Sequence, residues 1–109
     1  MDEAPALTVV VPARDEEENV GPLVHEVATV LRERGVAFEL VIVDDGSRDR
    51  TAENLAALAA SRPWLRPLAL GTASGKSAAL RAGILAARAD VVATMDADLQ
   101  DDPRSLDAG

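Results

Sequence analysis

The sequence contains no cysteine and no tyrosine, and only one tryptophan and one phenylalanine. The absence of cysteine excludes disulfide bonds and thiolate metal sites. Aromatic residues make up only 2% of the chain while apolar residues make up 48%, so the core has to be built from Val, Leu, Ile and Ala. A chain of 109 residues is one domain or part of one.

The sequence also lacks any long apolar run. No stretch approaches the roughly 18 consecutive apolar residues of a membrane span. Residues 1–5 are acidic and polar, which does not resemble a secretory signal. We therefore expect a cytoplasmic protein.

Positive charge is scarce: 11 basic residues stand against 19 acidic ones, a formal net charge of −8. An acidic chain attracts nucleic acid and anionic membranes poorly, so we expect no nucleic-acid partner. An anionic ligand such as a diphosphate would need a local reversal of sign, which a divalent cation held by carboxylates could supply. The simpler interpretation of the net charge is solubility.

Four apolar runs, at residues 7–11, 38–43, 65–70 and 90–95, alternate with helical patterns at about 20–34, 51–59 and 77–88. This alternation predicts an α/β fold with a Rossmann-like, doubly wound and mainly parallel sheet. We expect Pro12 to end the first strand, and Pro67 to make the third strand irregular or place it near an edge. Gly83, in an Ala-rich helix, suits close packing on the sheet.

Polar residues gather where each predicted strand ends. They are Arg14, Asp15 and Glu16 after the first strand, Asp44 and Asp45 after the second, Gly75 and Lys76 after the third, and Asp96, Asp98 and Gln100 after the fourth. Ligands of open α/β sheets bind beyond the carboxyl ends of the strands. The pattern therefore predicts a binding site at this edge of the sheet.

Asp96 and Asp98 lie two residues apart, so on an extended segment they point to the same side with Cα atoms roughly 6–7 Å apart. Together with Gln100 they offer oxygen ligands, which favour Mg²⁺ or Mn²⁺. The alternative is a solvated acidic turn that caps a following helix. Asp44 and Asp45 likewise suit either ribose and base contacts or the chemistry of a tight turn.

Gly75 and Lys76 open a helix, where backbone N–H groups and an ammonium group could meet a phosphate. A Walker loop needs four residues between its glycines, and Gly71 and Gly75 enclose only three. Lys76 is therefore either a point charge for a phosphate or a solvated side chain.

Four segments in order resemble the family 2 inverting glycosyltransferases of GT-A fold, nearest to the polyprenyl- or dolichyl-phosphate mannosyl- and glucosyltransferases. They are residues 11–19, 41–51, 75–80 and 95–103. The resemblance implies a nucleoside-diphosphate sugar, linked to UDP or GDP, as donor and a polyprenyl phosphate as acceptor. It also implies that the full-length protein works at the cytoplasmic face of a membrane.

By position, the resemblance also implies roles for single residues. The substrate-binding residues would be Pro12, Ala13, Arg14, Glu16, Asp44 or Asp45, Gly75, Lys76 and Asp96. The metal ligands would be Asp96 and Asp98, helped by Gln100, holding the Mg²⁺ or Mn²⁺ that bridges the diphosphate. The chain departs from the family at Thr72 and Ala73, where relatives carry Arg-Asn, and at Ala89, where they often have Gly.

Members of this family continue beyond the fourth motif into an acceptor-binding half that carries the general base. The resemblance thus implies that residues 1–109 are the N-terminal nucleotide-sugar-binding part, with the catalytic base elsewhere. We expect this part to be inactive alone, and an exposed sheet edge to allow self-association.

Other α/β classes fit less well. A receiver domain needs a phosphoacceptor Asp at the end of its third strand, where Leu70 and Gly71 stand. A haloacid-dehalogenase-type phosphatase carries Asp-x-Asp on its first strand, not its fourth. A P-loop nucleotidase fails on the glycine spacing.

Overall fold

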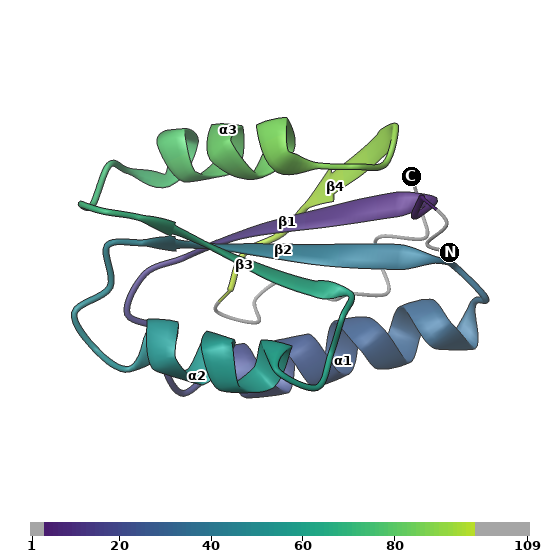
Figure 1. Cartoon of the computed structure of the whole chain (residues 1–109), viewed down its shortest axis with the longest axis horizontal. Coiled ribbons are helices and arrows are strands. Elements are labelled where there is room, and N and C mark those ends of the chain that lie inside the picture. Colours follow the sequence, from purple (N-terminus) through teal and green to yellow (C-terminus); the bar gives the residue numbers. More distant parts are fainter. Residues whose placement is uncertain (1–3, 98–109) are drawn as a thin grey trace.

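The computed structural model describes residues 4–97, which form a parallel sheet covered by helices on both faces (Figure 1). The elements, in chain order, are β1 (Leu7–Ala13), α1 (Val20–Glu33), β2 (Phe38–Asp45), α2 (Thr51–Ala59), β3 (Leu65–Leu70), α3 (Lys76–Ala86) and β4 (Val91–Thr94). All strand pairs are parallel, in the order β3-β2-β1-β4. The predicted α/β class, sheet type and element order are confirmed.

The central strands β1 and β2 are buried on both faces, which explains why they are almost continuously apolar. Val9 and Val11 of β1 pack into the core beneath α1 and α2. Val10, which points the other way, packs with Ala79 of α3. Figure 1 shows α3 on one face and α1 and α2 on the other.

Pro12 does not end the first strand as predicted, because β1 continues to Ala13. Val10 accepts the N–H of Met95 at 3.2 Å, so the carbonyl and amide of Val10 face β4. Two residues later, the nitrogen of Pro12 faces the same side, beyond the last β1–β4 pair, Val10 with Thr94. No ladder hydrogen bond is therefore lost at the proline.

Three other predicted bounds differ slightly from the structure. β2 extends to Asp45, so the acidic pair belongs to the strand itself. Helix α3 begins at Lys76 and ends at Ala86, and β4 is four residues long. β3 has the predicted bounds and lies at the edge of the sheet, where Pro67 is tolerated.

Gly83 lets α3 approach the sheet closely, as its place in an Ala-rich helix predicted. A Cβ added there would lie 2.3 Å from Val10 Cγ1 and 3.1 Å from Val43 Cγ2. Even a methyl group would therefore push the helix away from β1 and β2.

A buried carboxylate, that of Glu39, joins the elements near the amino ends of the strands. Glu39 accepts hydrogen bonds from Thr8 Oγ1, Arg66 Nη1 and the backbone N–H of Arg88, each at 2.6 Å. Burial alone would raise the pKa of Glu39, but these hydrogen bonds and the charge of Arg66 outweigh it and lower the pKa. Glu39 thereby ties the α3–β4 connection to β1, β2 and β3.

The strand order places the reversal of winding between β1 and β4. From β1 the chain winds outward to β2 and β3, and then crosses back so that β4 lies on the other side of β1. The order 3-2-1-4 is that of dinucleotide-binding folds, whereas receiver domains have the order 2-1-3-4-5. The receiver alternative is therefore excluded. In the part of the chain described here, no helix is long and apolar enough to cross a membrane.

Candidate functional site

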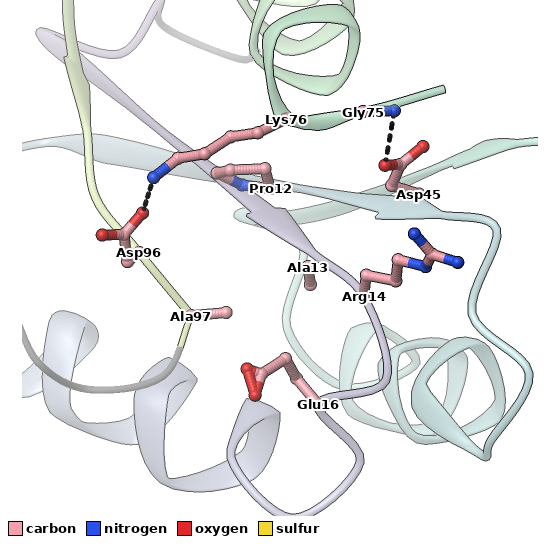
Figure 2. A pocket seen from close by; sticks show the side chains of 9 residues that line it. All are labelled: Pro12, Ala13, Arg14, Glu16, Asp45, Gly75, Lys76, Asp96 and Ala97. Atoms are coloured by element: carbon pink, nitrogen blue, oxygen red, sulfur yellow. Dashed lines mark hydrogen bonds and ion pairs between the residues drawn. The ribbon is translucent and has the colours of Figure 1, made fainter. Parts of the chain in front are cut away.

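A pocket of about 320 Å³ opens at the carboxyl ends of β1, β2 and β4, next to the start of α3. It lies at the point where the sheet reverses its winding, which is where such folds bind ligands. Its lining residues, shown in Figure 2, are Pro12, Ala13, Arg14, Glu16, Asp45, Gly75, Lys76, Asp96 and Ala97. The volume suits a small-molecule ligand.

Lys76 reaches across this pocket to Asp96 (Figure 2). The Nζ atom of Lys76 lies 2.5 Å from Asp96 Oδ1, and the two side chains are 62% and 37% exposed. Lys76 is the first residue of α3, whereas Asp96 follows the end of β4. The ion pair therefore links two elements across the ligand space.

Asp45 holds the loop that leads into α3. Its Oδ1 accepts the backbone N–H of Ser74 at 2.7 Å, and its Oδ2 accepts that of Gly75 at 3.0 Å. The side chain is buried at the end of β2. Asp45 thus fixes the backbone from which the Lys76 side chain starts.

Gly46 brings the same loop into backbone contact with the end of β2. Its φ is +67°, and a Cβ there would lie 2.4 Å from the amide nitrogen of Ala73. Only glycine meets both requirements, the left-handed backbone and the close approach. The loop from Thr72 to Gly75 is therefore held in place by the hydrogen bonds of Asp45 and by the backbone contact of Gly46.

Asp44 has a different position from its neighbour. It is buried, and its Oδ1 accepts the backbone N–H of Ser47 at 3.0 Å. Asp44 is not among the residues that line the pocket. Of the two aspartates, Asp45 therefore lines the pocket, whereas Asp44 accepts a hydrogen bond within the turn.

The loop after β1 is held by the loop after β2. The N–H of Asp15 donates to Ser47 Oγ at 2.9 Å, and the carboxylate of Asp15 accepts the N–H of Arg48 at 2.7 Å. These contacts stabilise the left-handed conformation of Asp15, whose φ is +53°. Arg14, directly before this residue, is exposed at the pocket on the side of Asp45 (Figure 2).

Glu16 is positioned by two further contacts. Its N–H donates to Thr51 Oγ1 at 2.9 Å, and its Oε1 accepts from Asn19 Nδ2 at 3.1 Å. Figure 2 shows its carboxylate directed toward Ala97, across the pocket from Lys76. Glu16 therefore presents a half-buried oxygen acceptor to the ligand space.

Asp49 stabilises the same pair of loops. Its carboxylate accepts the N–H groups of Thr51, the first residue of α2, at 2.9 Å and of Glu17 at 3.2 Å. Partial desolvation would raise the pKa of Asp49, but the hydrogen bonds from the side chain and backbone of Thr51 and from Glu17 lower it.

The sequence did not predict that Ser47 and Thr51 hold the loop after β1. Ser47 and Thr51 lie in a segment singled out for its aspartates, yet both hold the loop that carries Arg14 and Glu16. Ala97 lines the pocket but offers no polar group that could have marked it. The hydroxyl residues of the turn and helix start that follow β2, Ser47 and Thr51, were the available signal.

The predicted metal ligands are only partly described by the structure. Asp98 and Gln100 lie outside residues 4–97, so their placement relative to Asp96 stays a prediction. Within those residues, no group of three or more His, Cys, Asp or Glu side chains could hold a metal ion. The donor chemistry of Asp96 does fit Mg²⁺ or Mn²⁺, since it places carboxylate oxygens at the pocket.

A comparison with protein families gives a match over nearly the whole chain. The model described as glycosyl transferase family 2 matches residues 8–108. Among curated proteins, the chain is 43% identical over 101 residues to a dodecaprenyl-phosphate galacturonate synthase from Rhizobium johnstonii. It is 43% identical over 102 residues to an undecaprenyl-phosphate 4-deoxy-4-formamido-L-arabinose transferase from Pseudomonas paraeruginosa. Each alignment covers 92% of this chain but 30% of the relative.

A solved structure is similar over the same part. The mannosyltransferase PcManGT from Pyrobaculum calidifontis, in complex with GDP-Man and Mn²⁺, matches with a TM-score of 0.71 and 28% identity. The match covers 97% of this chain and 31% of that one. The chain thus spans about 30% of the length of the curated relatives it matches.

Proposed function

The chain belongs to glycosyl transferase family 2, and on that premise we propose that its pocket binds a nucleoside-diphosphate sugar together with Mg²⁺ or Mn²⁺. The observation that carries the proposal is the convergence of residues from three strand ends and one helix start around the carboxylate of Asp96. The pocket occupies the position at which α/β sheets with this strand order bind nucleotides.

Within the pocket, the residues divide by chemistry. We assign the base and ribose to Pro12, Ala13, Arg14 and Glu16, which follow β1 and offer one apolar surface, one cation and one acceptor. Asp45 holds the neighbouring loop and keeps lone pairs for a hydroxyl or a base N–H.

The diphosphate is assigned to the opposite side of the pocket, with Gly75 and Lys76 at the start of α3. Asp96, with Asp98 and Gln100, is assigned to the divalent cation. When bound, such a cation supplies Lewis acidity that stabilises the departing nucleoside diphosphate. Lys76 adds a positive charge near the same phosphates.

For the whole protein we propose metal-dependent, inverting transfer of a hexose to a polyprenyl phosphate. Both similar curated proteins carry a polyprenyl phosphate in their names, and the similar solved structure holds GDP-Man and Mn²⁺. Since the chain covers 30% of those curated relatives, we propose that it is the nucleotide-sugar-binding part. The acceptor site and general base are assigned to residues beyond it, and the whole enzyme to the cytoplasmic face of a membrane.

Calorimetric titration tests the binding proposal. GDP, UDP and their hexose conjugates are titrated into the chain with and without Mn²⁺, using native protein, Asp96→Asn, Asp98→Ala and Asp90→Asn. Asp90 is an exposed residue at the other end of β4 and controls for the change in charge. We expect Mn²⁺-dependent binding of at least one nucleotide that both site variants lose and Asp90→Asn keeps. Binding that needs no metal and survives both site variants would contradict the assignment.

The edge of the sheet that β4 forms supports a second proposal, on self-association. β4 pairs only with β1 in the described part of the chain, and Val91 is 61% exposed. We propose that two copies associate through this edge. Sedimentation equilibrium should show a monomer–dimer equilibrium that Val91→Lys shifts to monomer; a native chain that stays monomeric at all concentrations contradicts it.

A further inference from the structure

The ion pair between Lys76 and Asp96 spans the space that the proposed function assigns to metal and diphosphate. Lys76 Nζ lies 2.5 Å from Asp96 Oδ1. The carboxylate assigned to a divalent cation is thus already in contact with a cation from the protein itself. Figure 2 shows the Lys76 side chain extended along the pocket wall above Pro12 toward Asp96.

The backbone around Lys76 fixes where this ammonium starts. Asp45 accepts the N–H groups of Ser74 and Gly75, directly before Lys76. Gly46 packs against the backbone of Ala73. The base of the lysine is therefore anchored, while its side chain is 62% exposed and long enough to reach other anions within the pocket.

An ammonium group on Oδ1 and a divalent cation bound to the same carboxylate repel each other. A metal bound at Asp96 therefore weakens the attraction between that carboxylate and Lys76, and the diphosphate is assigned to the start of α3 in the same pocket. The phosphate oxygens and the Asp96 carboxylate are thus alternative partners of one lysine.

We infer that Lys76 is an exchangeable counter-cation: it holds Asp96 until metal and nucleotide arrive, and then transfers to the diphosphate. This inference rests on the proposed function. It makes Lys76 the source of a coupling between the two ligands. Metal alone has to displace the ammonium, whereas metal with nucleotide provides the ammonium with a new partner.

The test measures Mn²⁺ binding directly, by electron paramagnetic resonance of free Mn²⁺, with and without the nucleotide that binds best. The variants are Lys76→Met and Arg81→Met. Both remove one positive charge from α3, but Arg81 is an exposed residue further along the helix and outside the pocket. Thermal unfolding confirms that each variant is folded.

We expect Lys76→Met to bind Mn²⁺ about tenfold more tightly than the native chain when nucleotide is absent, within the usual range of coupling between sites. Arg81→Met should change the affinity less than about twofold. The gain in Mn²⁺ affinity that nucleotide gives the native chain should shrink in Lys76→Met and persist in Arg81→Met.

Two results would overturn the inference, and they differ in what else they affect. If Lys76→Met binds Mn²⁺ no more tightly than the native chain, or more weakly, Lys76 is no competitor for Asp96, while the proposed function stands. If the native chain binds no Mn²⁺ even with nucleotide, both the inference and the proposed metal site are wrong.

Discussion

The carboxylate of Asp45 accepts the backbone N–H of Gly75 at 3.0 Å, and so joins the end of β2 to the start of α3 across 30 residues of sequence. Its other oxygen accepts the N–H of Ser74 at 2.7 Å. One side chain therefore sets where the loop, and with it Lys76, stands relative to the pocket.

Replacing Asp45 tests this connection. Asp45→Ala removes the acceptor of two backbone N–H groups and should lower the free energy of unfolding by about 2–3 kcal/mol, since hydrogen bonds to a charged group are strong. It should also weaken nucleotide binding. Asp45→Asn, which keeps one acceptor oxygen, should lose less on both counts in urea denaturation and calorimetry. Equal losses in both variants would show that the charge matters more than the two hydrogen bonds.

Gly46→Ala tests the close approach of the loop. The new Cβ would meet the backbone of Ala73 and would also strain a residue with positive φ. Gly35→Ala is the matched control, because its φ is +68° but nothing lies within 4 Å of its Cβ. We expect Gly35→Ala to cost about 1 kcal/mol and Gly46→Ala about 1–3 kcal/mol more. In calorimetry, only Gly46→Ala should weaken nucleotide binding.

Gly83 and Gly21 give opposite predictions for the same substitution in a helix. Gly83→Ala places a methyl group 2.3 Å from Val10 Cγ1, and overpacking of this kind costs about 1–3 kcal/mol. Gly21→Ala meets nothing within 4 Å, and alanine in a helix is about 0.5–1 kcal/mol better than glycine. Thermal unfolding should therefore show a lower midpoint for Gly83→Ala and a higher one for Gly21→Ala. A stabilised Gly83→Ala would mean that α3 lies further from the sheet.

The lowered pKa of Glu39 predicts a specific dependence of stability on pH. Because the folded pKa lies below the unfolded value near 4.5, the stabilisation is fully present above about that pH. It is lost as the pH falls through the folded pKa. Urea denaturation between pH 7 and pH 3 should show this loss.

Glu39→Gln should be about 2 kcal/mol less stable than the native chain at pH 7, since it removes the negative charge that accepts the hydrogen bond of Arg66. It should also lose less stability toward pH 3, and the two profiles should converge. Glu33→Gln, at an exposed residue of α1, makes the same change in net charge and serves as control. Parallel profiles for the native chain and Glu39→Gln would contradict the role of Glu39.

Sequence patterns predicted the fold well because its central strands are buried on both faces. Residues 40–43 are apolar without interruption, and Gly35 marks the end of α1. Pro12 was misread because tolerance of a proline depends on which side of the strand has a partner. That depends on how far β4 extends along β1, which local sequence does not encode.

The sequence predicted most of the residues that line the pocket, but not the contacts between them. Parallel strands bring their carboxyl ends to one edge, so Arg14, Asp45 and Asp96 could be expected to meet there. That Asp45 holds a loop while Asp44 stabilises a turn depends on the path of residues 71–75, a tertiary feature. The pairing of Lys76 with Asp96 likewise needs the position of α3 above β1.

A crystal structure of the chain with GDP or UDP and Mn²⁺, with the metal located by its anomalous scattering, tests most directly whether Asp96 binds the metal of a nucleotide complex. We predict a manganese peak at bonding distance from an Asp96 carboxylate oxygen. The diphosphate should bridge to that metal beside Lys76. A nucleotide bound elsewhere, or one in this pocket with no metal at Asp96, would contradict it.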